Sequence, residues 1–144
     1  METGWLEIKI IMGKIIINVD YTDNFAAVPA NDSIACISTG RTLEELKSNM
    51  EEALRWHIES MREDGEPVPV EFDGDWQLEW NLSMRALLHY TEKLVPKAAI
   101  AKVTGINQQQ LTHYASGYRE PRPAMRARII EGIHQIANQL SAIS

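Results

Sequence analysis

Short apolar runs separated by turn residues fill most of the N-terminal half of the chain. Lys14–Asp20 (KIIINVD) is rich in β-branched residues and too short for an average helix, so we expect a central strand there. Phe25–Pro29 and the alternating Ser33–Thr39 predict two more strands, which with the first would form a meander. A further strand is expected over 76–82, where four apolar residues alternate with polar ones: Trp76, Leu78, Trp80 and Leu82.

A long amphipathic helix is expected between the third and fourth of these strands. Thr42 is followed three residues later by Glu45, which is the spacing of a capping box at a helix start. From Thr42 to Arg62 an apolar stripe recurs at three- and four-residue steps and must lie on the sheet. Its members are Leu43, Leu46, Met50, Ala53, Leu54, Ile58 and Met61. Gly65 and the prolines after it end the helix. The predicted order is β-β-β-α-β.

The C-terminal half shows helical spacing throughout. Met84–Val95 predicts a first helix, Pro96 suits the first turn of a second, and Gly105 ends that second helix. Asn107 is placed to cap a third helix. The last helix is expected from Ala124, with an apolar stripe of Met125, Ile129, Ile133, Ile136 and Leu140. The predicted fold class is therefore α+β, with a β-β-β-α-β domain followed by an all-α domain of about four helices.

Within Pro96–Pro123 the third helix combines an apolar side with a polar one. Leu111 and Tyr114 share a face that can pack against the preceding helix. Four polar side chains are then left pointing outward: Gln108, Gln109, Thr112 and His113. Glutamine can bond bidentately to adenine, and threonine can touch a thymine methyl group in the major groove. The pattern favours a helix-turn-helix whose second helix reads base edges. An ordinary helical hairpin with solvated glutamines is the alternative.

The net charge of −6 is the sum of two opposite halves. Residues 1–83 hold 6 Lys/Arg against 17 Asp/Glu, a balance of −11, whereas residues 84–144 hold 8 against 3, a balance of +5. Only the second half is therefore electrostatically suited to a phosphate backbone. The acidic half suggests a basic protein partner, although its acids could equally serve to solvate the long helix.

Composition excludes several other classes. With 44% hydrophobic and 24% charged residues, and no apolar run near the ~20 residues of a membrane span, we expect no membrane segment. The N-terminus lacks a basic region and a cleavage site, so we expect no signal peptide and a cytoplasmic protein. Cys36 is the single cysteine, and no Cys/His pair has zinc-ligand spacing. We therefore expect no intramolecular disulfide, no metal and no cofactor.

Two motifs of the acidic half resemble a known family. Thr42–Glu45 (TLEE) begins the long helix and Asp64–Pro69 (DGEPVP) follows it, as in the N-terminal domain of HicB-type antitoxins of type II toxin-antitoxin systems. The resemblance implies a truncated ribonuclease-H-like fold over 12–82, with 1–11 as an N-terminal extension or Met12 as the natural start. It also implies a partner, a small basic HicA-type ribonuclease toxin, which the acidic domain would bind and neutralise.

The basic half, 84–144, resembles the phage-repressor, or Xre, class of helix-turn-helix domains through TGINQQQLTHYASGYREPRP (104–123). On that match Gln108, Gln109, Thr112 and His113 are the base readers. Five residues fall where the class holds phosphates: Lys97, Ser116, Tyr118, Arg119 and Arg122. The class often carries a glutamine near the start of its second helix, where this chain has Pro96–Ala99. Lys97 would replace that phosphate contact.

The implied ribonuclease-H-like fold raises a catalytic alternative, since ribonuclease H chemistry needs two metal ions held by clustered carboxylates. Asp20, Asp23 and Asp32 are the only acids near the first strands, and they sit in or beside turns. The inner stripe of the long helix carries no acid, and no histidine is paired with a Ser, Cys or carboxylate at a catalytic spacing. We therefore expect a protein that is not an enzyme and has no catalytic residues.

The favoured hypothesis is an antitoxin that also represses its own operon by binding a double-stranded DNA operator. The rival is a solitary transcriptional regulator whose N-terminal domain senses another protein or ligand. Ile130 and Ala137 widen the apolar stripe of the last helix, so we expect a homodimer or a higher even oligomer. A two-fold pair of recognition helices would suit a palindromic operator.

Overall fold

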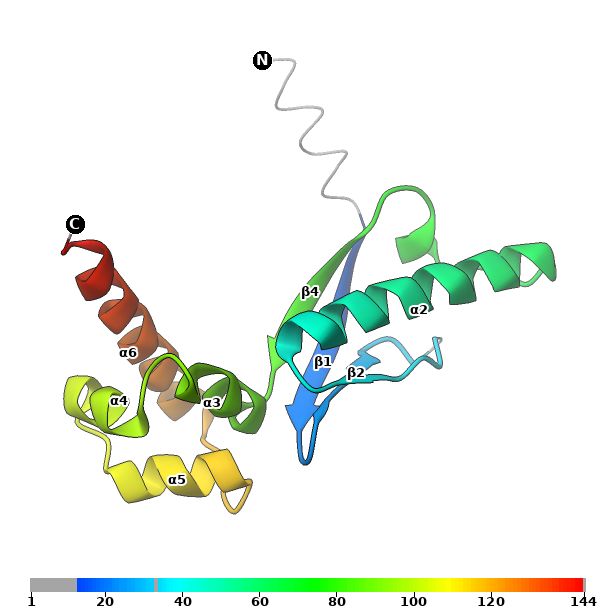
Figure 1. Ribbon diagram of the computed structural model, residues 1–144. Helices are drawn as coiled ribbons and strands as arrows, with labels where there is room; N and C mark the ends of the chain where they lie inside the picture. The colour runs from blue at the N-terminus through cyan, green and yellow to red at the C-terminus, as the bar shows by residue number, and fades with distance from the viewer. Residues whose placement is uncertain (1–12, 33, 144) are drawn as a thin grey trace. The chain divides into compact units, whose positions relative to one another are not determined.

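The computed structural model describes residues 13–32 and 34–143, which divide into two compact units at the Leu82–Ser83 junction (Figure 1). Within these residues, unit 1 ends at Leu82 and combines a mixed four-stranded sheet with helices, whereas unit 2 begins at Ser83 and is helical. The α+β class is confirmed. The expected extension over 1–11, the alternative start at Met12 and the first residue of the expected third strand, Ser33, lie outside the described residues.

The sheet of unit 1 is built around β1 (Lys14–Tyr21). β1 pairs antiparallel with β2 (Phe25–Pro29) and parallel with β4 (Gln77–Leu82). β2 pairs antiparallel with β3 (Ser38–Gly40), which gives the order β3-β2-β1-β4. The expected meander and the central position of the first strand are confirmed. Because parallel strands need a crossover connection, the long helix between β3 and β4 makes the β1–β4 pair possible.

The prediction of a strand over Ser33–Thr39 is wrong in extent, because only its last two residues, together with Gly40, belong to β3. Ala27 pairs with Ser38, so a longer ladder would place Pro29 opposite residue 36. Successive residues of a strand direct their backbone groups alternately to the two neighbouring strands. The Ala30 N–H donates to the Ile16 carbonyl of β1 (2.9 Å), so the backbone of Pro29 faces β3, and proline has no N–H to donate there. Residues 34–37 therefore run outside the ladder, and the Ile37 side chain is 73% exposed.

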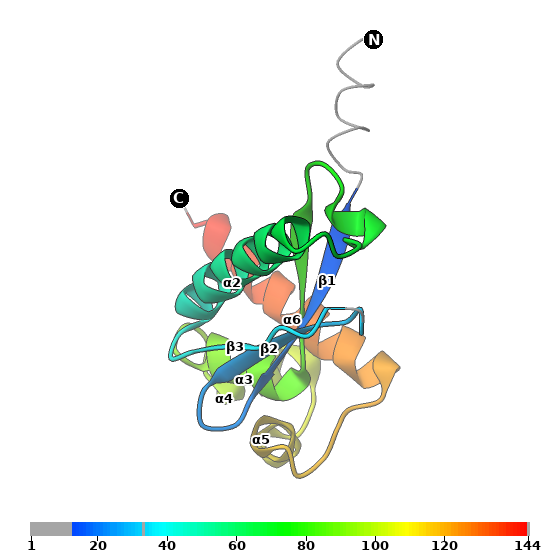
Figure 2. The same cartoon turned by 90° about the vertical axis from the view of Figure 1, so that its right-hand side faces the viewer.

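α2 (Leu43–Glu63) covers one face of the sheet (Figure 2). The Thr42 hydroxyl accepts a hydrogen bond from the Glu45 N–H (3.1 Å), as expected for the cap. The predicted apolar stripe is the packed side of the helix, although Ala53 and Met61 are only half-buried. Gly40 lies under α2, where an added Cβ would stand 2.5 Å from the Leu46 nitrogen. Only glycine allows this close approach of the helix to β3.

The segment between α2 and β4 contains one short 3₁₀ turn, η1 (Val70–Phe72). Phe72 is buried, and its ring meets the Trp76 ring edge-on at a centroid distance of 5.4 Å. Along β4 the apolar residues Leu78, Trp80 and Leu82 are half-buried while the alternating polar residues are exposed. The expected alternation is therefore confirmed from Leu78 to Leu82, whereas Trp76, expected as the first residue of this strand, lies just before it.

Unit 2 contains four helices among the described residues: α3 (Met84–Glu92), α4 (Lys97–Thr104), α5 (Gln108–Ser116) and α6 (Pro123–Ser141). α3 ends before the expected Val95, because the N–H groups of Leu94 and Val95 both donate to the Thr91 carbonyl in a tight turn. A residue before proline also disfavours the helical conformation. Pro96 is consequently the N-cap of α4 rather than a residue of its first turn.

The core of unit 2 is shared by all four of these helices. α5 packs against α3 and α4, and α4 packs against α6. The buried cluster consists of Met84, Leu88, Ile100, Ile106, Leu111, Tyr114, Ala115 and Ile129. Apolar side chains extend beyond this cluster at the end of α6 and just after it, since Leu140 is 60% exposed and Ile143, which follows the helix, is 80% exposed. Within the described residues, no helix combines the length and the apolar character that crossing a membrane requires.

Candidate nucleic-acid interface

The turn between α4 and α5 is fixed by three consecutive residues. Gly105 adopts the left-handed conformation (φ 75°), and its N–H donates to the Ala101 carbonyl (2.8 Å). Ile106 is buried in the core of unit 2, so it anchors the middle of the turn. The Asn107 side chain accepts the Gln109 N–H (2.8 Å) at the start of α5. The two capping roles expected for Gly105 and Asn107 are confirmed.

α5 buries one face and exposes the other. Leu111, Tyr114 and Ala115 are buried, whereas Gln108, Gln109 and Thr112 are exposed in one row on the opposite side. The row is therefore held on a helix whose position is set by packing. Thr112 donates its hydroxyl hydrogen to the Gln108 carbonyl (3.1 Å), which leaves the oxygen as an acceptor and the methyl group uncovered.

Gln110 has a role that the sequence pattern does not reveal. Its side-chain amide donates to the Tyr114 hydroxyl (2.7 Å), one turn further along α5. This hydrogen bond gives the almost fully buried Tyr114 hydroxyl a partner, and it directs the Gln110 side chain away from the exposed row. The i,i+4 spacing of a Gln and a Tyr is the one signal that could have indicated it.

The C-terminal end of α5 is tied to the loop that follows it. The Ser116 hydroxyl donates to the His113 carbonyl (3.1 Å) and accepts the Tyr118 N–H (3.3 Å). The rings of His113 and Tyr118 stack at a tilt, with centroids 5.0 Å apart. His113 is half-buried, so of the four expected base readers it is the least accessible. Tyr118 is exposed and presents its ring and hydroxyl next to the row.

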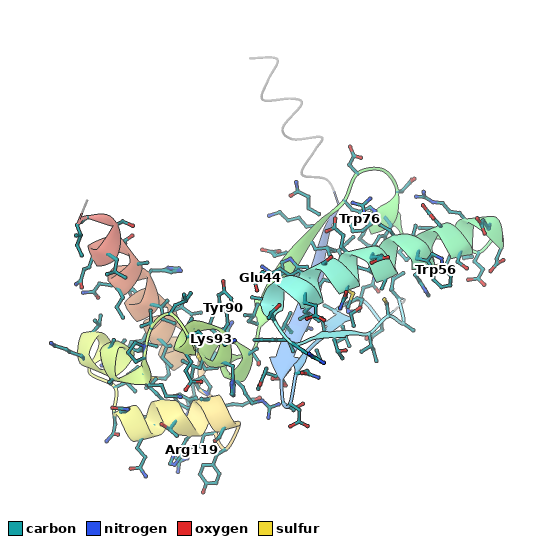
Figure 3. All side chains as sticks on the ribbon, in the orientation of Figure 1. Glu44, Trp56, Trp76, Tyr90, Lys93 and Arg119 are labelled. Atoms are coloured by element: carbon teal, nitrogen blue, oxygen red, sulfur yellow. The ribbon has the colours of Figure 1, made fainter. Side chains whose placement is uncertain are left out.

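Two of the expected phosphate contacts are exposed arginines on the loop that joins α5 to α6. Arg119 lies beside α5 (Figure 3), and its backbone N–H donates to the His113 carbonyl (3.3 Å). Arg122 is the N-cap of α6. A guanidinium group can bind a phosphate through two parallel hydrogen bonds.

Lys97 is placed differently from the two arginines. Its ammonium nitrogen lies 2.9 Å from a Glu92 carboxylate oxygen, and its side chain is only 18% exposed. The hydrogen bond and the charge of Lys97 lower the pKa of Glu92. A phosphate would have to compete with Glu92 for this ammonium group, so Lys97 is the weakest of the expected phosphate contacts.

Arg128 of α6 is a further cation whose partner the sequence did not indicate. Its guanidinium donates to the Thr104 carbonyl at the end of α4. Gly132, one turn further along α6, lies so close to the Thr104 methyl group that a Cβ would overlap it. α4 and α6 are thereby joined at Thr104, next to the turn that positions α5.

Three acids near the first strands and one thiol are the candidate chemical groups of unit 1. Asp20 accepts the Tyr21 N–H (2.7 Å), while Asp23 and Asp32 are exposed. No group of three His, Cys, Asp or Glu side chains among the described residues could hold a metal ion. Partial burial raises the pKa of the Cys36 thiol, which lowers its thiolate fraction and its reactivity.

Comparisons of the chain with models of known protein families, with curated proteins and with solved structures found no match. The functional assignment therefore depends on the local geometry of the two units and on the motifs of the sequence.

Proposed function

We propose that unit 2 is a helix-turn-helix domain that binds double-stranded DNA, with α5 as its recognition helix. The observation that carries the proposal is the exposed row of Gln108, Gln109 and Thr112 on a helix whose other face is locked into the core. Carboxamide and hydroxyl groups on a helix of this kind suit the hydrogen-bonding edges of the major groove. His113 would contribute where its ring edge remains accessible beside Tyr118.

The charge of unit 2 supports the same proposal. Residues 84–144 carry a balance of +5, and Arg119 and Arg122 lie on the loop directly after α5. Their guanidinium groups, with the Ser116 and Tyr118 hydroxyls, would hold the phosphate backbone while the α5 side chains meet the bases. Affinity should therefore fall steeply with salt, because each phosphate contact releases a counterion.

We further propose that unit 1 is a truncated ribonuclease-H-like domain that binds and neutralises a small basic HicA-type ribonuclease. Its β-β-β-α-β order and the TLEE and DGEPVP motifs around α2 support this assignment. Residues 1–83 carry a balance of −11, which complements a cationic RNA-binding surface. An acidic domain seated on that surface would exclude RNA without performing chemistry. The chain would then act as an antitoxin and repressor of its own operon.

The end of α6 supports assembly through a second copy of the chain. Leu140 is exposed beyond the core, Ala137 is exposed one turn before it on α6, and Ile143 is exposed just after the helix ends. Pairing of two α6 helices would bury these apolar groups. Two α5 helices related by a two-fold axis would suit half-sites about one helical turn, ~34 Å, apart on DNA.

One experiment tests both parts of the proposal. The full chain is purified from its source cell and is assayed for a bound small basic protein with ribonuclease activity that the chain suppresses. The same preparation is titrated with DNA from upstream of its own gene and with shuffled DNA, using fluorescence anisotropy. Binding to the upstream DNA without any associated ribonuclease would leave the solitary regulator as the correct function. Equal affinity for both DNAs would refute sequence-specific recognition.

A further inference from the structure

One side of α2 carries a polar and aromatic stripe that is exposed in unit 1. Its members recur at steps of four and three residues, so they project from the same side of the helix. They are Glu45, Asn49, Glu52, Trp56, Glu59 and Glu63, and all six are exposed. At 1.5 Å per residue this outer stripe is ~27 Å long. It runs along the helix away from the buried residues that face the sheet.

Trp56 lies at the middle of the outer stripe with 74% of its surface exposed (Figure 3). It borders a shallow hollow of about 380 Å³ that is also lined by Asn49, Glu52 and Ala53. The Asn49 side-chain amide donates to the Thr39 carbonyl (2.9 Å), which fixes one wall of the hollow against β3. Tryptophan is enriched among the residues that contribute most of the binding energy at protein interfaces.

The other two tryptophans of the described chain show what such a ring attracts. The Arg55 guanidinium lies 5.3 Å from the Trp76 ring centroid, and the Lys47 ammonium lies 5.6 Å from that of Trp80. Both cations come from α2 and lie within the distance of a cation–π interaction. Within the described residues of unit 1, no cation lies over the Trp56 ring.

α2 carries its cations outside the outer stripe. Its three cations are all engaged away from the outer stripe, because Lys47 and Arg55 cover tryptophan rings and Arg62 donates to the Phe72 carbonyl (3.1 Å). Glu52 and Glu59 stand one turn before and one turn after Trp56. Within the described residues of unit 1, neither carboxylate is paired with a cation. The outer stripe therefore combines an uncovered ring with uncompensated negative charge.

We propose that the outer stripe of α2 is the docking surface for a basic protein, which seats an arginine or lysine side chain on the Trp56 ring between Glu52 and Glu59. The charge complementarity of the stripe favours this occupant, since a nucleic acid or an anionic membrane surface would be repelled by the same carboxylates. The inference rests on the proposed function in one respect, namely that the basic protein is the ribonuclease partner. It adds the location and the anchoring contact.

The test measures the affinity of the full chain for the ribonuclease identified by co-purification, using biolayer interferometry at two salt concentrations. Trp56→Ala is expected to weaken binding at least tenfold, because the anchoring ring is removed. The double substitution Glu52→Gln/Glu59→Gln is expected to slow association at least threefold at low salt, with a smaller effect at high salt.

A matched control lies on the same helix. Glu44→Gln/Glu51→Gln removes the same amount of charge from exposed positions outside the outer stripe. This control pair should change the affinity less than twofold. Circular dichroism melting of every variant confirms that α2 is intact. The proposal is overturned if the control pair matches the stripe pair, or if Trp56→Ala stays within twofold of the parent chain.

A second probe separates this proposal from the proposed function. A synthetic arginine-rich peptide of net charge +5, and an analogue with glutamine in place of every arginine, are titrated into the full chain and its Trp56→Phe variant by tryptophan fluorescence. Quenching by the arginine peptide alone, lost in Trp56→Phe, supports the docking surface even where no ribonuclease partner is found. Equal quenching in both chains refutes it. If Trp56→Ala dissociates the chain's own oligomer in sedimentation experiments, the occupant is a second copy and the proposal is wrong.

Discussion

Replacing Gln109 by alanine separates base reading from folding more cleanly than any other change on α5. The Asn107 cap accepts the backbone N–H of residue 109, so the substitution leaves the cap intact. Gln109 is exposed, and alanine is a better helix former, so the free energy of unfolding should not fall. Any loss of DNA affinity can then be assigned to the missing carboxamide.

The expected loss is that of one base contact. A bidentate glutamine–adenine pair contributes about 1 to 3 kcal/mol of discrimination, which corresponds to about a 5- to 150-fold weaker Kd on the upstream DNA. On shuffled DNA the change should be less than twofold. Arg119→Ala should behave differently, weakening both DNAs to a similar degree and reducing the slope of log K against log salt by ~0.9.

Fluorescence anisotropy with both DNAs at four salt concentrations provides the measurement. Gln135→Ala is the matched control, because Gln135 is exposed on α6, on the side away from its apolar residues. Its DNA binding should equal that of the parent chain. If Gln109→Ala and Arg119→Ala weaken both DNAs equally, or if Gln109→Ala changes neither, then α5 does not read bases and the reasoning from its exposed row fails.

Three further predictions concern the packing that supports these surfaces. Gly132→Ala should lower the free energy of unfolding of unit 2 by about 1 to 3 kcal/mol in urea titrations, because its Cβ would overlap the Thr104 methyl group, and the hydrogen bond from Thr104 to the Ile100 carbonyl holds that side chain in place. Adding Thr104→Ser, which removes the methyl group, should recover part of the lost stability. No recovery would mean that the methyl group is not the obstacle. Gly40→Ala should destabilise unit 1 by a similar amount in thermal melts followed by tryptophan fluorescence, since all four tryptophans precede residue 83. A melting temperature unchanged from the parent would contradict the close approach of α2 to β3. The hydrogen bond and charge of Lys97 lower the pKa of Glu92, so this pair stabilises the folded chain above the unfolded pKa of glutamate (about 4.3), and the stabilisation is lost as the pH falls through the lower folded value. Lys97→Met should therefore lower the free energy of unfolding by at most ~1 kcal/mol at pH 7 and leave it unchanged near pH 2. An equal loss at both pH values would show that Lys97 acts through packing.

Periodicity and capping residues were sufficient to predict most of the elements. The α2 stripe, the Thr42 cap and the Gly105–Asn107 turn depend on residues within a few positions of each other, so their pattern is visible in the sequence. The sequence predicts too long a third strand, because the end of this strand is set by its partner β2. The ladder stops at Pro29, which lies on β2 and lacks an N–H toward β3. Strand alternation within 33–39 carries no information about that partner.

The candidate interface shows the same limit. Exposure of Gln108, Gln109 and Thr112 follows from helical spacing and was predictable. The pairing of Lys97 with Glu92 and the bond from Gln110 to Tyr114 depend on side-chain conformations that spacing does not determine. Helical spacing likewise indicates that Trp56 is exposed. It does not indicate that the three cations of α2 contact other groups and leave the Trp56 ring uncovered.

The parallel pairing of β1 with β4 has a consequence for how unit 1 is made. Lys14 pairs with Gln77 and Val19 pairs with Leu82, so one edge of β1 is hydrogen-bonded only to residues more than sixty positions later in the chain. During synthesis the meander and α2 can form first, but one edge of β1 stays unpaired until β4 has left the ribosome. An open edge of this kind can pair with other chains. A fragment that ends before Gln77 should therefore aggregate, and any useful fragment of unit 1 must continue through Leu82.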